Sequence, residues 1–152
     1  MKLVETVRRY NTLELLEGMV DISADHFRDH MYHHVSPFEK ATIFSFGRQC
    51  GHTEAIKEYV SKSVLESDDD VLIVCHNQHT AREMNKRLGF DAALSVAVVN
   101  NIKNFDKFRG CSPKSVKIIF DTCTMGQIKA FISEALQYNA YDIKAITIVA
   151  PL

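Results

Sequence analysis

The sequence predicts a three-layer α/β fold with a mainly parallel sheet of about five strands. Two observations support this. Apolar runs of strand length alternate with segments of helical periodicity, and the runs are nearly unbroken, as expected for strands covered on both faces. We expect one domain over residues 1–152, with an N-terminal helical segment over residues 1–36 and an α/β core over residues 40–152.

The N-terminal segment has the pattern of one long amphipathic helix. Asn11 is a suitable N-cap, and we expect the helix to end near His34, because the residue before Pro37 is disfavoured in helical geometry. The apolar positions recur at steps of three and four, which predicts one buried face. These positions are Leu13, Leu16, Val20, Ala24, Phe27 and Met31.

The core alternates strands and helices in regular order. We expect strands over residues 40–46, 71–75, 94–99, 116–120 and 145–150, and helices over residues 53–65, 80–88 and 125–138. The polar stretch 67–70 is expected to form a turn.

Composition limits the function classes. The 18 Lys and Arg residues nearly balance the 19 Asp and Glu residues, so the net charge of −1 does not indicate a strongly basic nucleic-acid binder, although a local basic patch stays open. No run approaches the roughly 18 to 20 apolar residues of a membrane span. We expect a cytoplasmic protein that does not bind membranes.

The cysteines favour a reducing compartment. Cys50, Cys75, Cys111 and Cys123 are far apart and form no C-x-x-C pair, which argues against a zinc ribbon and a dense disulfide framework. Cys50 sits before an expected helix, where a thiol pKa can fall. Because no cysteine–histidine catalytic pattern accompanies it, a packing role is the preferred interpretation.

Residues 46–53 form a variant of a phosphate-binding loop. They lie between an expected strand and an expected helix, where a Walker A loop G-x-x-x-x-G-K-[ST] belongs. Gly51 and Thr53 match the pattern, whereas Phe46 takes the first glycine position and His52 takes the lysine position. In such loops backbone N–H groups hold the phosphates and the Ser or Thr hydroxyl binds Mg²⁺. The alternative is an ordinary glycine-containing turn.

Residues 116–121 have the form of a Walker B strand. Asp121 follows the apolar run, where an aspartate supports the Mg²⁺ shell, and Thr122 stands where a water-activating glutamate is usual. Thr53 and Asp121 are therefore the candidate Mg²⁺ residues. The alternative for Asp121 is a helix cap or a turn residue.

Together these segments resemble the ATPase domain of phage terminase large subunits, which are helicase-like P-loop NTPases. The resemblance is carried, in family order, by residues 48–53, 71–84, 108–110 with 118–121, and 146–151. It implies a strand over residues 145–150 between the Walker A and Walker B strands. It also implies ATP and Mg²⁺ as ligands, with phosphate contacts from Arg48, Gln49, Cys50, Gly51, His52 and Thr53.

Departures from the family pattern argue against an active motor. His52 replaces the lysine, Thr122 replaces the catalytic glutamate and Ala150 replaces the threonine of the family's T-P element. Nothing before Gln49 resembles an adenine-reading glutamine, and we expect the family's nuclease domain to be missing. Losing one preorganised charge at such a site costs on the order of 10²- to 10³-fold in rate.

We therefore expect a degenerate, non-hydrolysing protein of a virus or prophage that binds a nucleotide or phosphate and a viral or host protein partner. One alternative is an unusual ATPase of DNA packaging or translocation, in which phosphate contact protonates His52 and a carboxylate from elsewhere activates water. The other is a structural or inhibitory protein with a vestigial pocket, filled by Phe46 or His52.

Four histidines on the N-terminal segment form a second candidate group. His26 and His30 are four residues apart and would share one helix face, a spacing that can hold a metal. His33 and His34 follow them, but no cysteine or paired carboxylate motif accompanies the group. A solvated or partner-facing helix edge is the preferred interpretation.

Overall fold

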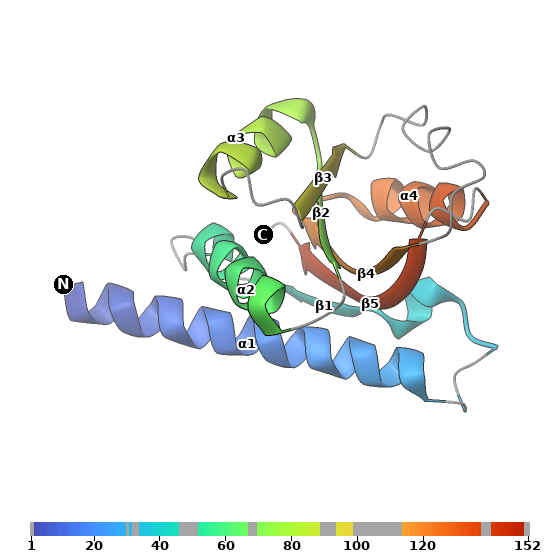
Figure 1. Ribbon diagram of the computed structural model, residues 1–152, viewed down its shortest axis with the longest axis horizontal. Helices are drawn as coiled ribbons and strands as arrows, with labels where there is room; N and C mark the ends of the chain where they lie inside the picture. The colour runs from blue at the N-terminus through green and yellow to red at the C-terminus, as the bar shows by residue number, and fades with distance from the viewer. Residues whose placement is uncertain are drawn as a thin grey trace.

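The computed structural model describes residues 2–29, 31, 34–45, 52–66, 70–88, 94–98, 114–137 and 141–150. These residues form a five-stranded sheet in which every pair is parallel, with helices on both faces (Figure 1). The strands, in their order across the sheet, are β1 (Thr42–Ser45), β5 (Tyr141–Ala150), β4 (Lys114–Asp121), β2 (Asp70–Cys75) and β3 (Leu94–Val98). The helices are α1 (Lys2–Arg28), the short 3-10 helix η2 (Pro37–Lys40), α2 (His52–Glu66), α3 (Gln78–Leu88) and α4 (Met125–Gln137).

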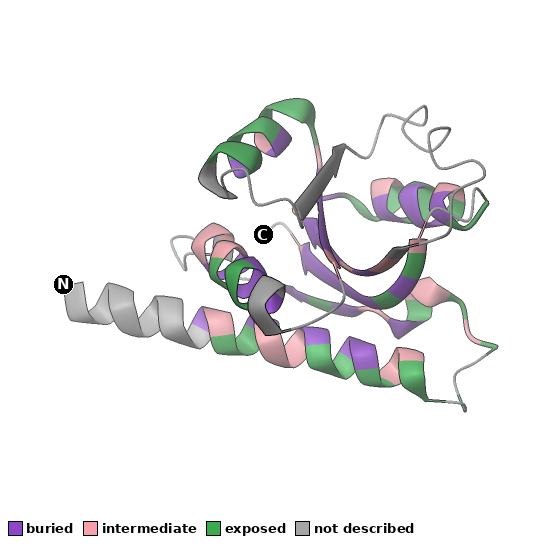
Figure 2. Ribbon diagram, in the orientation of Figure 1, coloured by how far each residue is buried: buried purple, intermediate pink, exposed green. Residues whose placement is uncertain are grey.

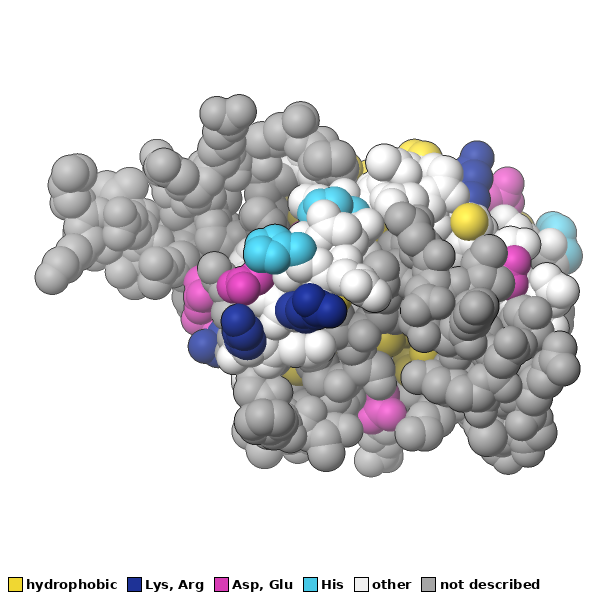
Figure 3. All heavy atoms as spheres, turned by 90° about the horizontal axis from the view of Figure 1, so that it is seen from above, with side chains coloured by type: hydrophobic (Ala, Val, Ile, Leu, Met, Phe, Trp, Pro, Cys, Tyr) yellow, Lys and Arg dark blue, Asp and Glu magenta, His cyan; other side chains and the backbone are white. Residues whose placement is uncertain are grey.

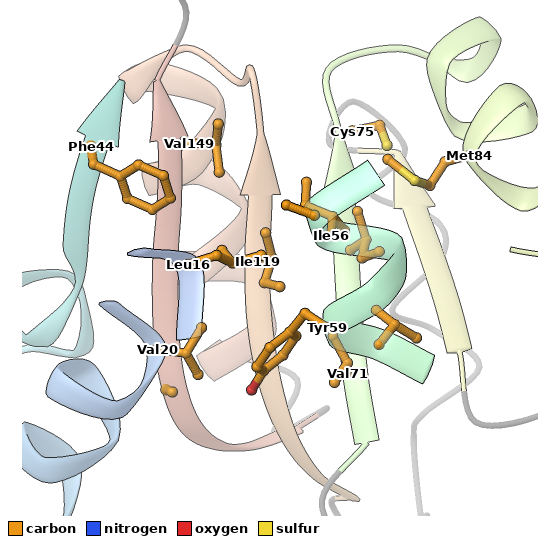
Figure 4. Packing of buried hydrophobic residues seen from close by; sticks show 14 of the residues in the cluster. Leu16, Val20, Phe44, Ile56, Tyr59, Val71, Cys75, Met84, Ile119 and Val149 are labelled. Carbon is orange, nitrogen blue, oxygen red and sulfur yellow. The ribbon is translucent and has the colours of Figure 1, made fainter. Parts of the chain in front are cut away.

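This architecture confirms the predicted α/β class with a parallel sheet. Successive strand residues point to opposite faces, so each strand contributes to two cores. One core joins the sheet to α1, α2 and α3, as Figure 4 shows for Leu16, Ile56 and Met84. The other joins it to α4 and includes an edge-to-face pair of Phe120 and Phe131, with ring centroids 5.6 Å apart. Buried residues accordingly follow the strands and the inner faces of the helices (Figure 2).

The N-terminal helix differs from its predicted bounds at both ends. It begins at Lys2, so Asn11 lies inside the helix and not at its N-cap. It stops at Arg28, well before His34, because the Asp29 side chain accepts the backbone N–H of Met31 at 2.9 Å and so favours a turn. Met31, predicted to lie on the buried face, is 80% exposed. The predicted positions Leu16, Val20 and Ala24 are buried.

Two helices of the core begin with polar caps directly after strands β2 and β4. Asn77 Oδ1 accepts the backbone N–H of Thr80 at 2.8 Å, which caps α3. Thr124 and Gln127 cap α4 reciprocally: Thr124 Oγ1 accepts the Gln127 N–H at 3.2 Å, and Gln127 Oε1 accepts the Thr124 N–H at 3.0 Å. These caps fix where the chain turns at the end of each strand. None of the described helices is both long and apolar enough to cross a membrane.

A buried serine ties α1 to the sheet. Ser23 is 0% exposed, and its Oγ donates to the Lys40 carbonyl at 2.9 Å while accepting the backbone N–H of Ile146 at 2.8 Å. The pairing of β1 with β5 begins one residue later, at Thr42 and Thr147. The serine hydroxyl therefore satisfies a strand N–H at a position that the neighbouring strand has not yet reached.

A threonine extends the same connection. Thr42 Oγ1 donates to the Met19 carbonyl of α1 at 2.9 Å and lies 3.2 Å from Thr147 Oγ1 of β5. The beginning of β1 is thus fixed to both the helix and the adjacent strand by buried polar contacts. Because hydrogen bonds are directional, these contacts fix one position of the helix along the sheet more precisely than apolar packing alone would.

We expect Ser23→Ala to lower the free energy of unfolding by about 1–3 kcal/mol, because it leaves a buried N–H and a buried carbonyl without their partner. Urea denaturation measures this change. Ser61→Ala is the matched control: Ser61 is exposed, bonds only to the Lys57 carbonyl within its own helix, and should change stability by less than about 0.5 kcal/mol. Equal effects of the two substitutions would contradict this role of Ser23.

Candidate functional site

The candidate site lies at the edge of the sheet where all strands end. Parallel strands bring their carboxyl ends to one edge, and ligands of open α/β sheets bind there. Backbone register places Ser45 of β1 beside Ala150 of β5, and Asp121 of β4 beside Val149 of β5 and Cys75 of β2. In Figure 4 this is the edge toward which the strand arrows point.

Helix α2 directs its N-terminus to the same edge. The helix begins at His52, and Thr53 in its first turn is half-buried. Unpaired N–H groups and the helix dipole make such an end favourable for an anion. The other predicted phosphate contacts, Arg48, Gln49, Cys50 and Gly51, lie outside the described residues, as does Phe46. Their roles remain predictions.

Asp121 is the buried acid of this edge. It ends β4, and the residue is only 3% exposed. Burial, and then the negative charge of Asp121, raise the pKa of Cys75 to about 12. Burial, Cys75 and Asp121, in that order, raise the pKa of Cys123 to about 12. Cys123 Sγ also donates to the Val74 carbonyl at 3.3 Å. Both thiols are therefore protonated packing groups and not nucleophiles.

Thr122 has an unusual backbone conformation. Its φ of 57° lies in the left-handed region, where a β-branched residue is a genuine outlier that costs of order 1–3 kcal/mol. Its backbone N–H donates to the Val149 carbonyl at 2.9 Å, which holds the strained residue against β5. The hydroxyl of Thr122 donates to the Asp121 carbonyl at 2.7 Å and lies 3.1 Å from His76 Nδ1.

His76 is a site residue that sequence reasoning missed. It follows β2 directly, as Thr122 follows Asp121 at the end of β4, and Gln127 Nε2 of α4 donates to its carbonyl at 3.3 Å. The sequence does indicate His76, because a polar residue directly after an apolar strand lies at the carboxyl edge of a parallel sheet. The sequence pattern alone identifies Thr122 only as a replacement of the family's catalytic glutamate.

The surface near this edge carries mixed charge. Figure 3 shows histidine, basic and acidic side chains side by side over α3. The exposed residues of α3 include His79, Arg82, Glu83 and Lys86, and Glu83 pairs with Lys86 at 3.8 Å. The described surface of this helix therefore offers no uniform basic stripe for nucleic acid.

A separate pocket of about 510 Å³ lies at the opposite edge of the sheet, between α1 and the beginnings of β4 and β5. It combines apolar and charged side chains, and none of the predicted site residues lines it. The lining consists of Asp21, Ala24, Phe27, Arg28, Lys117, Asp142, Ile143 and Lys144.

The N-terminal histidines are not gathered in the part of the chain that the structure describes. His26 is half-buried on α1, His34 is exposed beyond its end, and His30 and His33 fall outside the described residues. No group of three or more metal-binding side chains occurs among the described residues. No protein-family profile, curated protein or solved structure matches this chain.

The two buried thiols make stability depend on pH. Above pH 9.0 the thiols of the unfolded chain ionise, whereas Cys75 and Cys123 of the folded protein stay protonated to about pH 12. The folded state then binds more protons, so stability should fall as pH rises through this window, by about 1 kcal/mol per pH unit for each thiol.

Denaturation curves recorded below and above pH 9.0 test this. In the double variant Cys75→Ala, Cys123→Ala the decline should be shallower, although the variant is less stable at neutral pH because of the cavities. Parallel declines in the two proteins would show that these thiols are not responsible.

Proposed function

We propose that the protein binds a nucleoside triphosphate with Mg²⁺ at the carboxyl edge of its sheet and hydrolyses it slowly or not at all. The observation that carries the proposal is the buried carboxylate of Asp121 at the end of β4, at the same edge as the N-terminus of α2. A helix N-terminus attracts phosphate, and a strand-end aspartate suits the accompanying cation.

The strand order supports this interpretation. The terminase resemblance implies that the strand of residues 145–150 separates the Walker A and Walker B strands, and β5 does lie between β1 and β4. The sequence that resembles a phosphate-binding loop, residues 46–53, then comprises the connection 46–51 between β1 and α2 and the first two residues of α2.

The donors present fit Mg²⁺. A hydroxyl from Thr53 and a carboxylate from Asp121 are hard oxygen ligands, which Mg²⁺ prefers, and it usually takes only one or two carboxylates beside phosphate and water. When bound, the ion would neutralise charge on the phosphates. The chain itself contributes the two side chains and the positive end of α2.

Slow turnover follows from what the edge lacks. Thr122 stands after Asp121, and its single hydroxyl proton is donated to the Asp121 carbonyl. A threonine in that state cannot take a proton from water as a glutamate does. With His52 in place of the lysine, two groups that stabilise phosphoryl transfer are replaced together.

The biological setting follows from the same resemblance. We propose a viral or prophage protein of the host cytoplasm whose nucleotide-bound state is recognised by a viral or host protein partner. Such a protein would use the bound nucleotide as a structural ligand. The second candidate is an ATPase of unusual design, which the arrangement of His76 and Thr122 favours.

Calorimetric titration with ATP, with and without Mg²⁺, tests the proposal. We expect saturable binding that Mg²⁺ strengthens, and Asp121→Asn should lower the affinity for Mg-ATP by about 10- to 100-fold, because the variant removes the charge that faces the cation. Asp21→Asn, at an exposed aspartate on α1, is the matched control and should bind like the parent protein.

The proposal fails if ATP does not bind in the presence of Mg²⁺. Its non-hydrolysing part fails separately if turnover exceeds about one per minute and is abolished by Asp121→Ala, since such a rate is within the range of functional NTPases. Thermal unfolding of each variant confirms that it is folded before titration.

A further inference from the structure

The hydrogen bonds around Thr122 fix the tautomer of His76. The Thr122 hydroxyl has one proton, and it donates that proton to the Asp121 carbonyl, which can only accept. Toward His76 Nδ1, 3.1 Å away, the same oxygen must therefore accept. In the neutral ring this hydrogen-bond pattern assigns the proton to Nδ1 and leaves a lone pair on Nε2.

Several contacts hold this arrangement in place. The Thr122 N–H is bonded to Val149 of β5, and the His76 carbonyl is bonded to Gln127 of α4. The left-handed backbone of Thr122 persists against its own preference, which indicates that the surroundings determine it. Nε2 makes no hydrogen bond to the described residues, and His76 is half-buried.

The other polar residues discussed at the ends of β2 and β4 are less suited to accept a proton from water. The Thr122 hydroxyl donates its proton within the backbone turn. Cys75 and Cys123 are fully buried thiols, and Cys123 donates to Val74. Asp121 is the proposed cation ligand. His79 is exposed on α3.

We propose that His76 is the general base of the slow hydrolysis at this site, and that Thr122 is its positioning residue. The inference rests on the proposed function. In this step a water oxygen bonds to the γ-phosphorus while the bond from phosphorus to the β,γ-bridging oxygen breaks, and its electron pair leaves on ADP. The water proton passes to His76 Nε2, which becomes imidazolium and returns the proton to solvent.

The tautomer can be measured without any ligand. Nitrogen-15 correlation spectra separate a protonated ring nitrogen from one with a lone pair. We expect His76 to be protonated on Nδ1 in the parent protein, and Thr122→Val to shift it toward the Nε2-protonated form. Valine keeps the branched shape and removes only the hydroxyl. An Nε2-protonated His76 in the parent protein would overturn the inference.

Single-turnover hydrolysis of Mg-ATP, with protein in excess, tests the chemical role. His76→Asn keeps an amide donor near the Nδ1 position but removes Nε2, and should lower the rate constant by about 10²-fold with little change in affinity. His76→Gln, which restores an acceptor near the Nε2 position without a base, should not recover the rate. Thr122→Val should lower the rate together with the tautomer change.

The control His79→Asn alters an exposed histidine of the neighbouring helix α3 and should leave the rate unchanged. Binding of Mg-ATP with an unaltered rate in His76→Asn overturns the role of His76 and leaves the proposed function standing. If hydrolysis by the parent protein never exceeds the protein-free rate, the role of His76 is also overturned and the proposed function is retained. Absence of Mg-ATP binding overturns both, so the two failures are distinguished by calorimetry.

Discussion

The structure depends on strand β5, because it is the only described strand that pairs with β1. β5 is 10 residues long and also pairs with β4 from Lys114 to Asp121, so it connects the edge strand β1 to the centre of the sheet. The Ile146 N–H of β5 donates to Ser23 Oγ of α1, one residue before the pairing with β1 begins. The Val149 carbonyl of β5 accepts the N–H of Thr122. One strand therefore positions the helix that precedes the sheet and the residues that follow β4.

The polar groups at the carboxyl ends of β2 and β4 are few and mostly buried. A buried carboxylate, two protonated thiols and a histidine lie around the ends of β2 and β4. Burial has the larger effect in raising the pKa of both thiols, and the carboxylate of Asp121 raises it further. The charge of Asp121 disfavours ionisation of the thiols, so among these three buried groups the negative charge is concentrated on Asp121. A single buried carboxylate opposite a helix N-terminus is a simple electrostatic basis for holding a cation and an anion together.

Much of the fold could be predicted from the sequence, since nearly unbroken apolar runs identified the core of each described strand. The beginning of β5 was not predicted: the expected strand started at residue 145, whereas β5 starts at Tyr141. Asp142 and Lys144 interrupt the apolar run there and are exposed on one face. Asn11 was misjudged as a cap because helix-forming residues precede it and extend the helix to Lys2. Asp121 was found from its place after an apolar run. The role of Thr122 could not be found that way, since a left-handed threonine contradicts local preference and arises only from tertiary contacts.

The dependence of β1 on β5 also has a consequence for the order of events during synthesis. The segment that resembles a phosphate-binding loop leaves the ribosome long before β5, which pairs with β1, the strand that precedes this segment. Thr147 of β5 follows Thr42 of β1 by 105 positions in the sequence. The nascent chain can form α1, α2 and β2 early, but β1 cannot pair with β5 until β5 has been synthesised. The carboxyl edge of the sheet is thus completed late in folding, because contacts of such long sequence separation form slowly.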